Sequence, residues 1–183
     1  MIIVFGPAGA GKTVQGKLLA AKNKWQWISA GQLLRNDNDP EIIKIVSSGD
    51  LVPIEEVNRL ITEAFEKADN IDHIVLDGFP RQIEEVDWLL DKSPFRGHSV
   101  DAVILIEIDK DEIIKRLSLR ARPDDTPKAI EERLEIYSTK MKPILDYFIS
   151  KGVSVISIDG IGTIEQVHNR ITEKLATCNL FKK

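Results

Sequence analysis

Apolar residues gather in five short runs along the chain. The runs are Ile2–Phe5, Trp25–Ser29, His73–Asp77, Ala102–Ile108 and Ser154–Ile158. Each run is nearly continuous instead of alternating with polar residues, which is typical of strands that are covered on both faces. The pattern therefore predicts five buried strands.

The stretches between these runs have the apolar spacing of helices. They are Lys12–Lys22, Glu41–Ser48, Ile54–Ala68, Lys110–Leu119, Pro127–Ser150 and Thr163–Ala176. Because strands and helices alternate, we expect a three-layer α/β fold in which helices flank a five-stranded parallel sheet. Ligands of such sheets bind at the carboxyl ends of the strands, so the segments directly after the strands should hold the chemistry.

The composition fits one globular domain over residues 1–183, with 43% hydrophobic and 30% charged residues. A net charge of -4 gives no reason to expect nucleic acid or an anionic membrane as a partner. No stretch approaches the roughly 20 apolar residues of a membrane span, and no signal peptide pattern is present. A single cysteine, Cys178, can form neither an internal disulfide nor a zinc site. We expect a cytoplasmic monomer.

A phosphate-binding motif follows the first run. Residues 6–13, GPAGAGKT, match G-x-x-x-x-G-K-[ST] in full and open the first helix. Backbone N–H groups and the helix N-terminus of such a loop cradle phosphates. The motif predicts an ATP site, without defining the reaction, and the residues concerned are Gly6, Pro7, Ala8, Gly9, Ala10, Gly11, Lys12, Thr13 and Val14.

A second motif, LDGFPR, covers residues 76–81. Asp77 ends the third run, where proteins with this kind of loop place the acid that holds magnesium through water. Gly78 and Pro80 define a turn from which Arg81 can grip a phosphate with two hydrogen bonds. The alternative for Arg81 is a surface ion pair with a neighbouring glutamate.

Four arginines form a third group: Arg116, Arg120, Arg122 and Arg133. Arg116 and Arg120 are four residues apart and share one helix face. Guanidinium groups near a phosphate loop suit phosphoryl transfer, which requires positioning and positive charge. The alternative is an exposed helix whose arginines pair with nearby glutamates.

Taken in order, these motifs resemble the adenylate kinase family over nearly the whole chain. The similar segments are residues 6–13, 29–35 (SAGQLLR), 49–53 (GDLVP), 77–81 (DGFPR) and the arginine group. The resemblance implies a P-loop fold and transfer of a phosphoryl group from Mg-ATP to AMP. It also implies a helical acceptor insert at 30–65 and a short lid at 120–126.

The resemblance further implies the roles of individual residues. Catalysis would involve Lys12, Arg81, Arg120, Arg122 and Arg133. The acceptor nucleotide would contact Ala30, Arg35, Leu51, Val52, Gly78, Arg81 and Glu85. Magnesium would be held near Thr13 and Asp77, largely through water or phosphate, and no zinc is expected. Arg116 and Gly160 would meet the ATP adenine, and Asp124 and Asp125 would pair with the lid arginines.

Three departures from the pattern that is usual in this family stand out. Thr13 and Val14 follow the loop lysine in place of Gly-Thr, Ala30 replaces a threonine, and Glu85 replaces a glutamine. Glutamine both donates and accepts, whereas an ionised glutamate only accepts. Our hypothesis is altered or relaxed acceptor selectivity, so that UMP, CMP or GMP is an alternative acceptor, unless Glu85 points to solvent or Gln82 takes its place.

The predicted lid is very short, because only Ala121 separates Arg120 from Arg122. A lid excludes water, which would otherwise compete with the acceptor. We therefore expect modest ATP hydrolysis without an acceptor. A nucleotide-dependent switch or ATPase is the less favoured alternative, since it would not need Arg35 and Arg81.

Overall fold

The computed structural model describes the backbone of residues 1–92, 99–120, 122 and 125–178, and their side chains except those of Lys92 and Arg120. Five parallel strands form one sheet in the order β2-β3-β1-β4-β5. The strands are β1 (Ile2–Phe5), β2 (Gln26–Ser29), β3 (Ile74–Asp77), β4 (Ala102–Glu107) and β5 (Ser154–Asp159). This confirms the predicted parallel α/β sheet, with strand ends that differ from the prediction by at most one residue.

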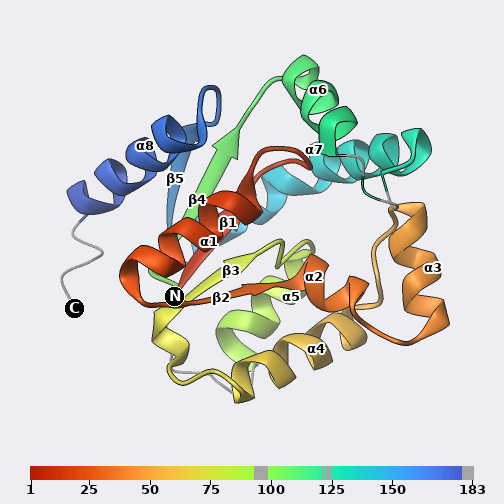
Figure 1. Cartoon of the computed structure of the whole chain (residues 1–183). Coiled ribbons are helices and arrows are strands. Elements are labelled where there is room, and N and C mark those ends of the chain that lie inside the picture. Colours follow the sequence, from red (N-terminus) through yellow and green to blue (C-terminus); the bar gives the residue numbers. More distant parts are fainter. Residues whose placement is uncertain (93–98, 121, 123–124, 179–183) are drawn as a thin grey trace.

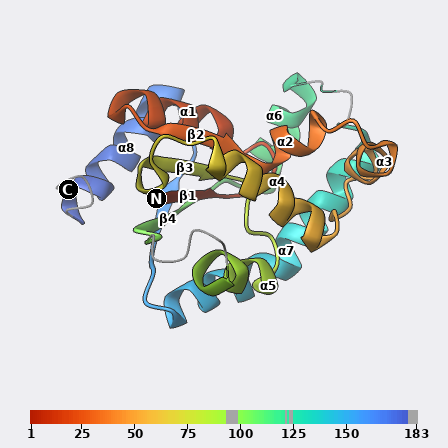
Figure 2. The same cartoon turned by 90° about the horizontal axis from the view of Figure 1, so that it is seen from below.

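Helices cover both faces of the sheet, as Figure 2 shows in cross-section. On one face, α1 (Lys12–Asn23) and α8 (Ile164–Thr177) bury side chains such as Leu19 and Ile171 against the strands. On the other face, α4 (Ile54–Glu66), α5 (Ile83–Asp87) and α7 (Pro127–Ser150) contribute Phe65, Val86 and Phe148 to a larger core. The three-layer prediction is therefore confirmed.

The central strands β1 and β3 are buried throughout, as their continuous apolar runs predicted. The edge strand β5 differs. Its Ile156 and Ile158 are buried against the α1/α8 layer, whereas Ser154, Ser157 and Asp159 are exposed. The prediction of full coverage is wrong for β5, because an edge strand meets fewer neighbours than a central one.

Three helices fill the segment between β2 and β3: α2 (Ala30–Arg35), α3 (Pro40–Ser48) and α4. Side-chain caps define the starts of α2 and α3, since Ser29 Oγ accepts from Gln32 N and Asp39 Oδ1 accepts from Glu41 N. In Figure 1, α3 stands away from the sheet, beside the start of α7. This segment is where the sequence predicts the acceptor insert.

Four short elements were not predicted: α2, α5 and the two turns described next. Helix α5 continues as a π-helical turn over Trp88–Lys92, and a 3-10 turn covers Ile71–His73. The helix α6 (Lys110–Arg120) follows β4 and ends at the predicted lid. Among the helices of the described residues, none has the length and apolar character needed to cross a membrane.

Candidate functional site

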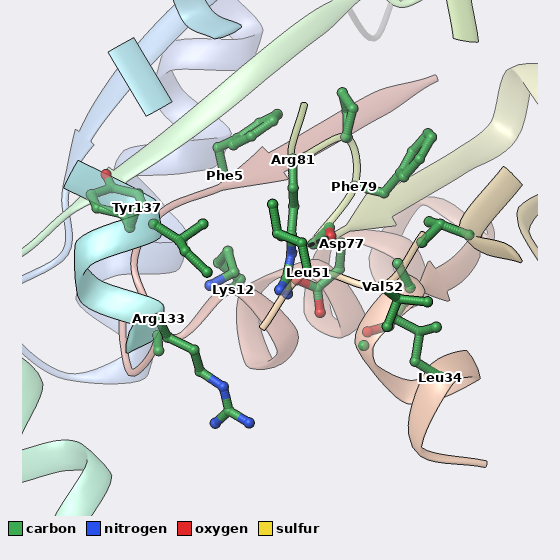
Figure 3. A pocket seen from close by; sticks show the side chains of 18 of the residues that line it. Phe5, Lys12, Leu34, Leu51, Val52, Asp77, Phe79, Arg81, Arg133 and Tyr137 are labelled. Carbon is green, nitrogen blue, oxygen red and sulfur yellow. Dashed lines mark hydrogen bonds between the residues drawn. The ribbon is translucent and has the colours of Figure 1, made fainter. Parts of the chain in front are cut away.

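A pocket of about 170 Å³ opens at the carboxyl ends of β1 and β3 (Figure 3). Its walls come from the phosphate loop, the α2–α4 segment, the DGFPR turn and α7. The predicted site residues that line it are Gly6, Ala8, Lys12, Thr13, Ala30, Arg35, Leu51, Val52, Asp77, Gly78, Arg81, Glu85, Arg122 and Arg133. One cavity therefore joins the residues that the sequence assigned to triphosphate and to acceptor.

Other predicted residues do not line this pocket. They are Pro7, Gly9, Ala10, Gly11 and Val14 of the phosphate loop, together with Arg116 and Gly160. The side chain of Arg120 and the whole of Asp124 lie outside the described residues, so these two predictions remain predictions.

The phosphate loop turns through glycines with left-handed backbone angles, including Gly9 (φ +84°) and Gly11 (φ +93°). A Cβ on Gly9 would lie 3.2 Å from Leu117 Cγ and 3.3 Å from the Ile113 carbonyl, so α6 packs directly against the loop. Lys12 Nζ donates to the Pro7 carbonyl at 2.8 Å. This hydrogen bond places the lysine amine across the phosphate loop, where the phosphates of a nucleotide would bind.

Thr13 and Asp77 meet at the bottom of the pocket. Thr13 Oγ1 donates to Asp77 Oδ2 at 2.8 Å, and Asp77 is buried at the end of β3. A hydroxyl and a carboxylate are oxygen ligands of the kind magnesium prefers, and magnesium usually adds substrate phosphates and water to one or two such groups. The pair fits a magnesium ion that arrives with a nucleotide. Within the described residues, no group of three or more His, Cys, Asp or Glu side chains could hold a metal ion.

Arg81 projects from the turn after β3, where the Phe79–Pro80 peptide bond is cis. Its Nε donates to the Gly78 carbonyl at 3.0 Å, and its guanidinium lies in the pocket beside Asp77 (Figure 3). Although Arg81 is exposed as a residue, desolvation of its guanidinium inside the pocket lowers its pKa, whereas the nearby carboxylates of Glu85 and Asp77 raise it. The guanidinium of arginine is not deprotonated in proteins, so Arg81 stays charged.

Arg133 connects three parts of the site. From α7, its Nη1 contacts Asp125 Oδ1 at 3.1 Å, and its Nη2 donates to the Val46 carbonyl of α3 at 3.1 Å. Asp125 is buried and also accepts from Arg122 N at 3.3 Å. The contact between Asp125 and a lid-side arginine, which the resemblance implied, is thus present.

The pocket is cationic on a chain whose net charge is -4. Its lining includes six cationic and three acidic side chains. The cations are Lys12, Arg35, Arg81, Arg122, Arg133 and Lys140, and the acids are Asp50, Asp77 and Glu85. A concave surface with this excess attracts polyanions of the size of nucleotides.

Glu85 is 2% exposed, so the alternative that it points to solvent is wrong. Its Oε2 accepts from Arg81 N at 2.5 Å and from Gln82 N at 3.2 Å. Burial raises the pKa of Glu85, while the two backbone donors and the charge of Arg81 lower it. Gln82 caps α5 and is not among the pocket residues.

Sequence reasoning missed the apolar walls of the pocket. These include Phe5, Leu34, Tyr137, Met141 and Ile144. Tyr137 and Met141 follow Arg133 at four-residue steps, so they share its helix face, and that spacing is the signal that could have identified them. Burial, and the carboxylate of Glu107, raise the pKa of Tyr137 to about 12, so its phenol is neutral at physiological pH.

Arg116 and Gly160 lie together apart from this pocket. Arg116 Nη2 donates to the Gly160 carbonyl at 3.0 Å, and its Nε contacts Glu112 Oε1 at 2.7 Å. A Cβ on Gly160 would come within 2.6 Å of Ile106 Cγ2 and 2.7 Å of Ile108 Cγ2, so this backbone approach requires glycine. Two residues that the sequence assigned to one adenine site are therefore adjacent.

Comparisons with known proteins identify the family to which the chain is similar. The model of a family described as adenylate kinase matches residues 4–153. Over 187 aligned residues, an adenylate kinase of Mycolicibacterium paratuberculosis is 33% identical, and the alignment covers 99% of each chain. An adenylate kinase of Nocardioides sp. is 34% identical, with 95% of this chain and 96% of the relative covered. One of Mycobacterium leprae is 33% identical, with 95% and 98% covered.

Proposed function

Because this chain belongs to the adenylate kinase family, we propose that it transfers the γ-phosphoryl group of ATP reversibly to AMP and forms two ADP. It is a nucleoside monophosphate kinase. The observation that carries the proposal is the single pocket in which the phosphate loop faces Arg35 and Arg81, with six cationic side chains in its lining. A simple nucleotide switch needs no second set of phosphate-binding arginines.

In this proposal, different charged side chains bind the donor phosphates, the acceptor phosphate and the transferred group. Lys12 and the loop N–H groups hold the β- and γ-phosphates, while Arg35 and Arg81 orient the acceptor phosphate for in-line attack. Arg122 and Arg133, with Arg120, balance the negative charge on the transferred group. Such transfer needs little covalent chemistry from the protein, because the gain comes from positioning and electrostatic stabilisation.

Magnesium bound with ATP would supply further neutralisation of the phosphate oxygens. Thr13 and Asp77 would hold it through their side-chain oxygens, directly or through water. Helices α2–α4, over residues 30–65, would serve as the acceptor insert, and residues 120–126 as the lid. The enzyme would act as a cytoplasmic monomer, with nucleotides as its partners.

The test is formation of ADP from Mg-ATP by the purified protein, measured separately with AMP, GMP, CMP, UMP and dTMP. AMP should stimulate the reaction strongly. Arg81→Lys keeps the positive charge but loses the bidentate hydrogen bonds to the acceptor phosphate. We expect kcat to fall about 10- to 100-fold, which is the loss expected for a hydrogen bond to a charged group.

The matched control is Arg59→Lys. Arg59 pairs with Glu56 and Glu63 on the exposed surface of α4, at 2.9 Å each, so the activity of this variant should be unchanged. If no monophosphate stimulates ADP formation, the proposal fails and an ATPase becomes the better interpretation.

A second candidate function, a kinase for another nucleoside monophosphate, is favoured by one observation. The buried carboxylate of Glu85 lines the pocket on the acceptor side.

A further inference from the structure

We propose that Gln15 is a positioning residue for ATP, which ties the helix behind the phosphate loop to the helix behind the last strand, and that it does so while His168 is neutral. This inference rests on the proposed function, because it concerns the ATP that the reaction uses. It goes beyond that function by assigning a role to two buried residues that do not line the pocket.

Two loops meet at the carboxyl end of β4. A Cβ on Gly6, which follows β1, would lie 2.6 Å from the Ile106 carbonyl oxygen. Gly160, which follows β5, donates from its N–H to the Glu107 carbonyl at 2.8 Å. The phosphate loop and the 159–163 loop therefore flank neighbouring residues of one strand. An ATP whose phosphates bind the first loop can extend toward the second, on the side of β1 that is away from the acceptor insert.

Gln15 joins the helices that begin at these two loops. It lies in the first turn of α1, two residues after Thr13, and is 3% exposed. Its Nε2 donates at 2.9 Å to the carbonyl of Ile164, the first residue of α8. Helices α1 and α8 lie side by side on one face of the sheet (Figure 2). This hydrogen bond therefore sets the start of α8 against the helix whose N-terminus receives the phosphates.

Arg170 makes α8 and the 159–163 loop one unit. Its Nη1 donates to the carbonyl of Asp159 at 2.9 Å and to that of Ile161 at 2.6 Å. A shift at the start of α8 would therefore move the loop as well. The loop includes Gly160, whose carbonyl accepts from Arg116. The position of α8 thus affects both groups that the sequence assigned to the far end of ATP.

His168 holds the amide of Gln15 in the orientation that this hydrogen bond requires. His168 is 2% exposed, and its Nδ1 lies 3.2 Å from Gln15 Oε1. Because the Nε2 of Gln15 faces a carbonyl oxygen, its Oε1 faces the ring, and Nδ1 must carry the proton. The other ring nitrogen is buried and has no hydrogen-bond partner within the described residues. The pair is therefore complete when His168 is neutral.

Protonation of His168 would add a buried donor that has no acceptor, together with a buried positive charge. Burial, followed by the charge of Lys22 on α1, lowers the pKa of His168. On α8, Glu165 stands three residues before His168 and is exposed. The strand residues that face the two helices, such as Ile104 and Ile158, are apolar. Because the charge that acts on the ring is repulsive, protonation should weaken the contact between α1 and α8.

The first test measures KM for ATP, KM for AMP and kcat in Gln15→Met, which keeps the length of the side chain but loses both hydrogen bonds. We expect KM for ATP to rise about 2- to 10-fold, the effect of one neutral hydrogen bond, with KM for AMP and kcat unchanged. Calorimetric titration with ATP should show the same weakening without turnover. Urea unfolding of the same variant measures its stability separately.

The matched control is Asn23→Leu. Asn23 Nδ2 donates to the Leu19 carbonyl at 2.8 Å, so this variant also removes an amide hydrogen bond from α1, at the end away from the phosphate loop. Both KM values should stay unchanged in it. If Gln15→Met lowers the free energy of unfolding but leaves the affinity for ATP as in the natural protein, Gln15 is merely structural and the inference is overturned.

The second test is a pH profile. In the natural protein, KM for ATP should be constant above about pH 6.5, the ordinary pKa of histidine, and should rise below it while KM for AMP does not. His168→Asn cannot take up a proton, yet its amide can still donate to Gln15 Oε1, so this rise should disappear. Protonation of ATP itself affects both proteins equally and cancels in the comparison.

Equal pH profiles in the natural protein and in His168→Asn would overturn the role of His168. If no monophosphate supports ADP formation, the proposed function fails, but calorimetric binding of ATP to Gln15→Met and to the natural protein still decides whether Gln15 positions ATP.

Discussion

The substitution Gly49→Ala tests how closely the predicted acceptor insert must approach α7. Gly49 ends α3 with φ +93°, and a Cβ there would lie 2.7 Å from the Ala129 carbonyl oxygen and 3.0 Å from Ala129 Cα. Both atoms belong to the backbone of the first turn of α7, so no side-chain rotation can relieve the contact. The bond from Arg133 to the Val46 carbonyl joins the same two helices.

Two costs add in this variant. An alanine in the left-handed region costs about 1–2 kcal/mol. Forcing an extra methyl group against fixed backbone costs about 1–3 kcal/mol more if α3 stays in place. If α3 instead moves away, the steric cost no longer lowers the free energy of unfolding. The pocket residues Leu51 and Val52, which follow Gly49, then move with α3.

Gly152→Ala is the matched control. Gly152 follows α7 with φ +80°, and a Cβ there would meet no heavy atom within 4 Å. The control should lose only the conformational cost of about 1–2 kcal/mol in chemical denaturation, and its KM values should not change.

Gly49→Ala should show either a free energy of unfolding lower by about 2–5 kcal/mol or a KM for AMP raised roughly 5- to 150-fold, with the KM for ATP unchanged. Steady-state kinetics with each nucleotide varied in turn, together with denaturant unfolding, separate these outcomes. The reasoning is refuted if the two glycine variants match in both stability and KM for AMP.

Three further predictions concern other parts of the chain. Burial, and to a lesser degree Lys22, lower the pKa of His168, so the unfolded state binds the proton first and stability should fall as pH drops below about 6.5. This slope should be weaker in His168→Asn, as urea unfolding at several pH values would show. Arg116→Ala should raise the KM for ATP about 10-fold and spare that for AMP, because Arg116 donates to Gly160 away from the acceptor side. ATP hydrolysis without an acceptor should be slow but measurable, and a rate below detection at saturating ATP would contradict the idea of an incompletely closing lid.

The fold was predictable because β1, β3 and β4 are buried on both faces, and such strands consist of nearly continuous apolar residues. Helix α5 was missed for a physical reason. It has five residues, too few to display a period, and its signature is the Gln82–Glu85 capping arrangement. The sequence suggested either contact with the acceptor or exposure to solvent for Glu85, whereas the structure shows its carboxylate at the start of a helix.

The candidate site was predictable where motifs carry polar chemistry and less so where its walls are apolar. Lys12, Asp77 and Arg81 follow strand ends, so parallel topology alone brings them together. Phe5 and Tyr137 have the spacing of core residues, and only the packing of α7 against the sheet distinguishes a pocket wall from a core. Val14 follows the loop motif, is 41% exposed and does not line this pocket, so its predicted contact with ATP stays a prediction.

The cations of the two candidate nucleotide regions share one arrangement. Lys12 donates to the Pro7 carbonyl, Arg81 to that of Gly78, Arg133 to that of Val46, and Arg116 to that of Gly160. A neutral carbonyl orients a charged side chain without cancelling its charge. Hydrogen bonds in which one partner is ionised are roughly twice as strong as neutral ones, and a phosphate oxygen adds the attraction of a second, opposite charge. Incoming phosphate oxygens could displace these carbonyls, whereas Arg133 and Arg116 also keep the carboxylates of Asp125 and Glu112 as partners.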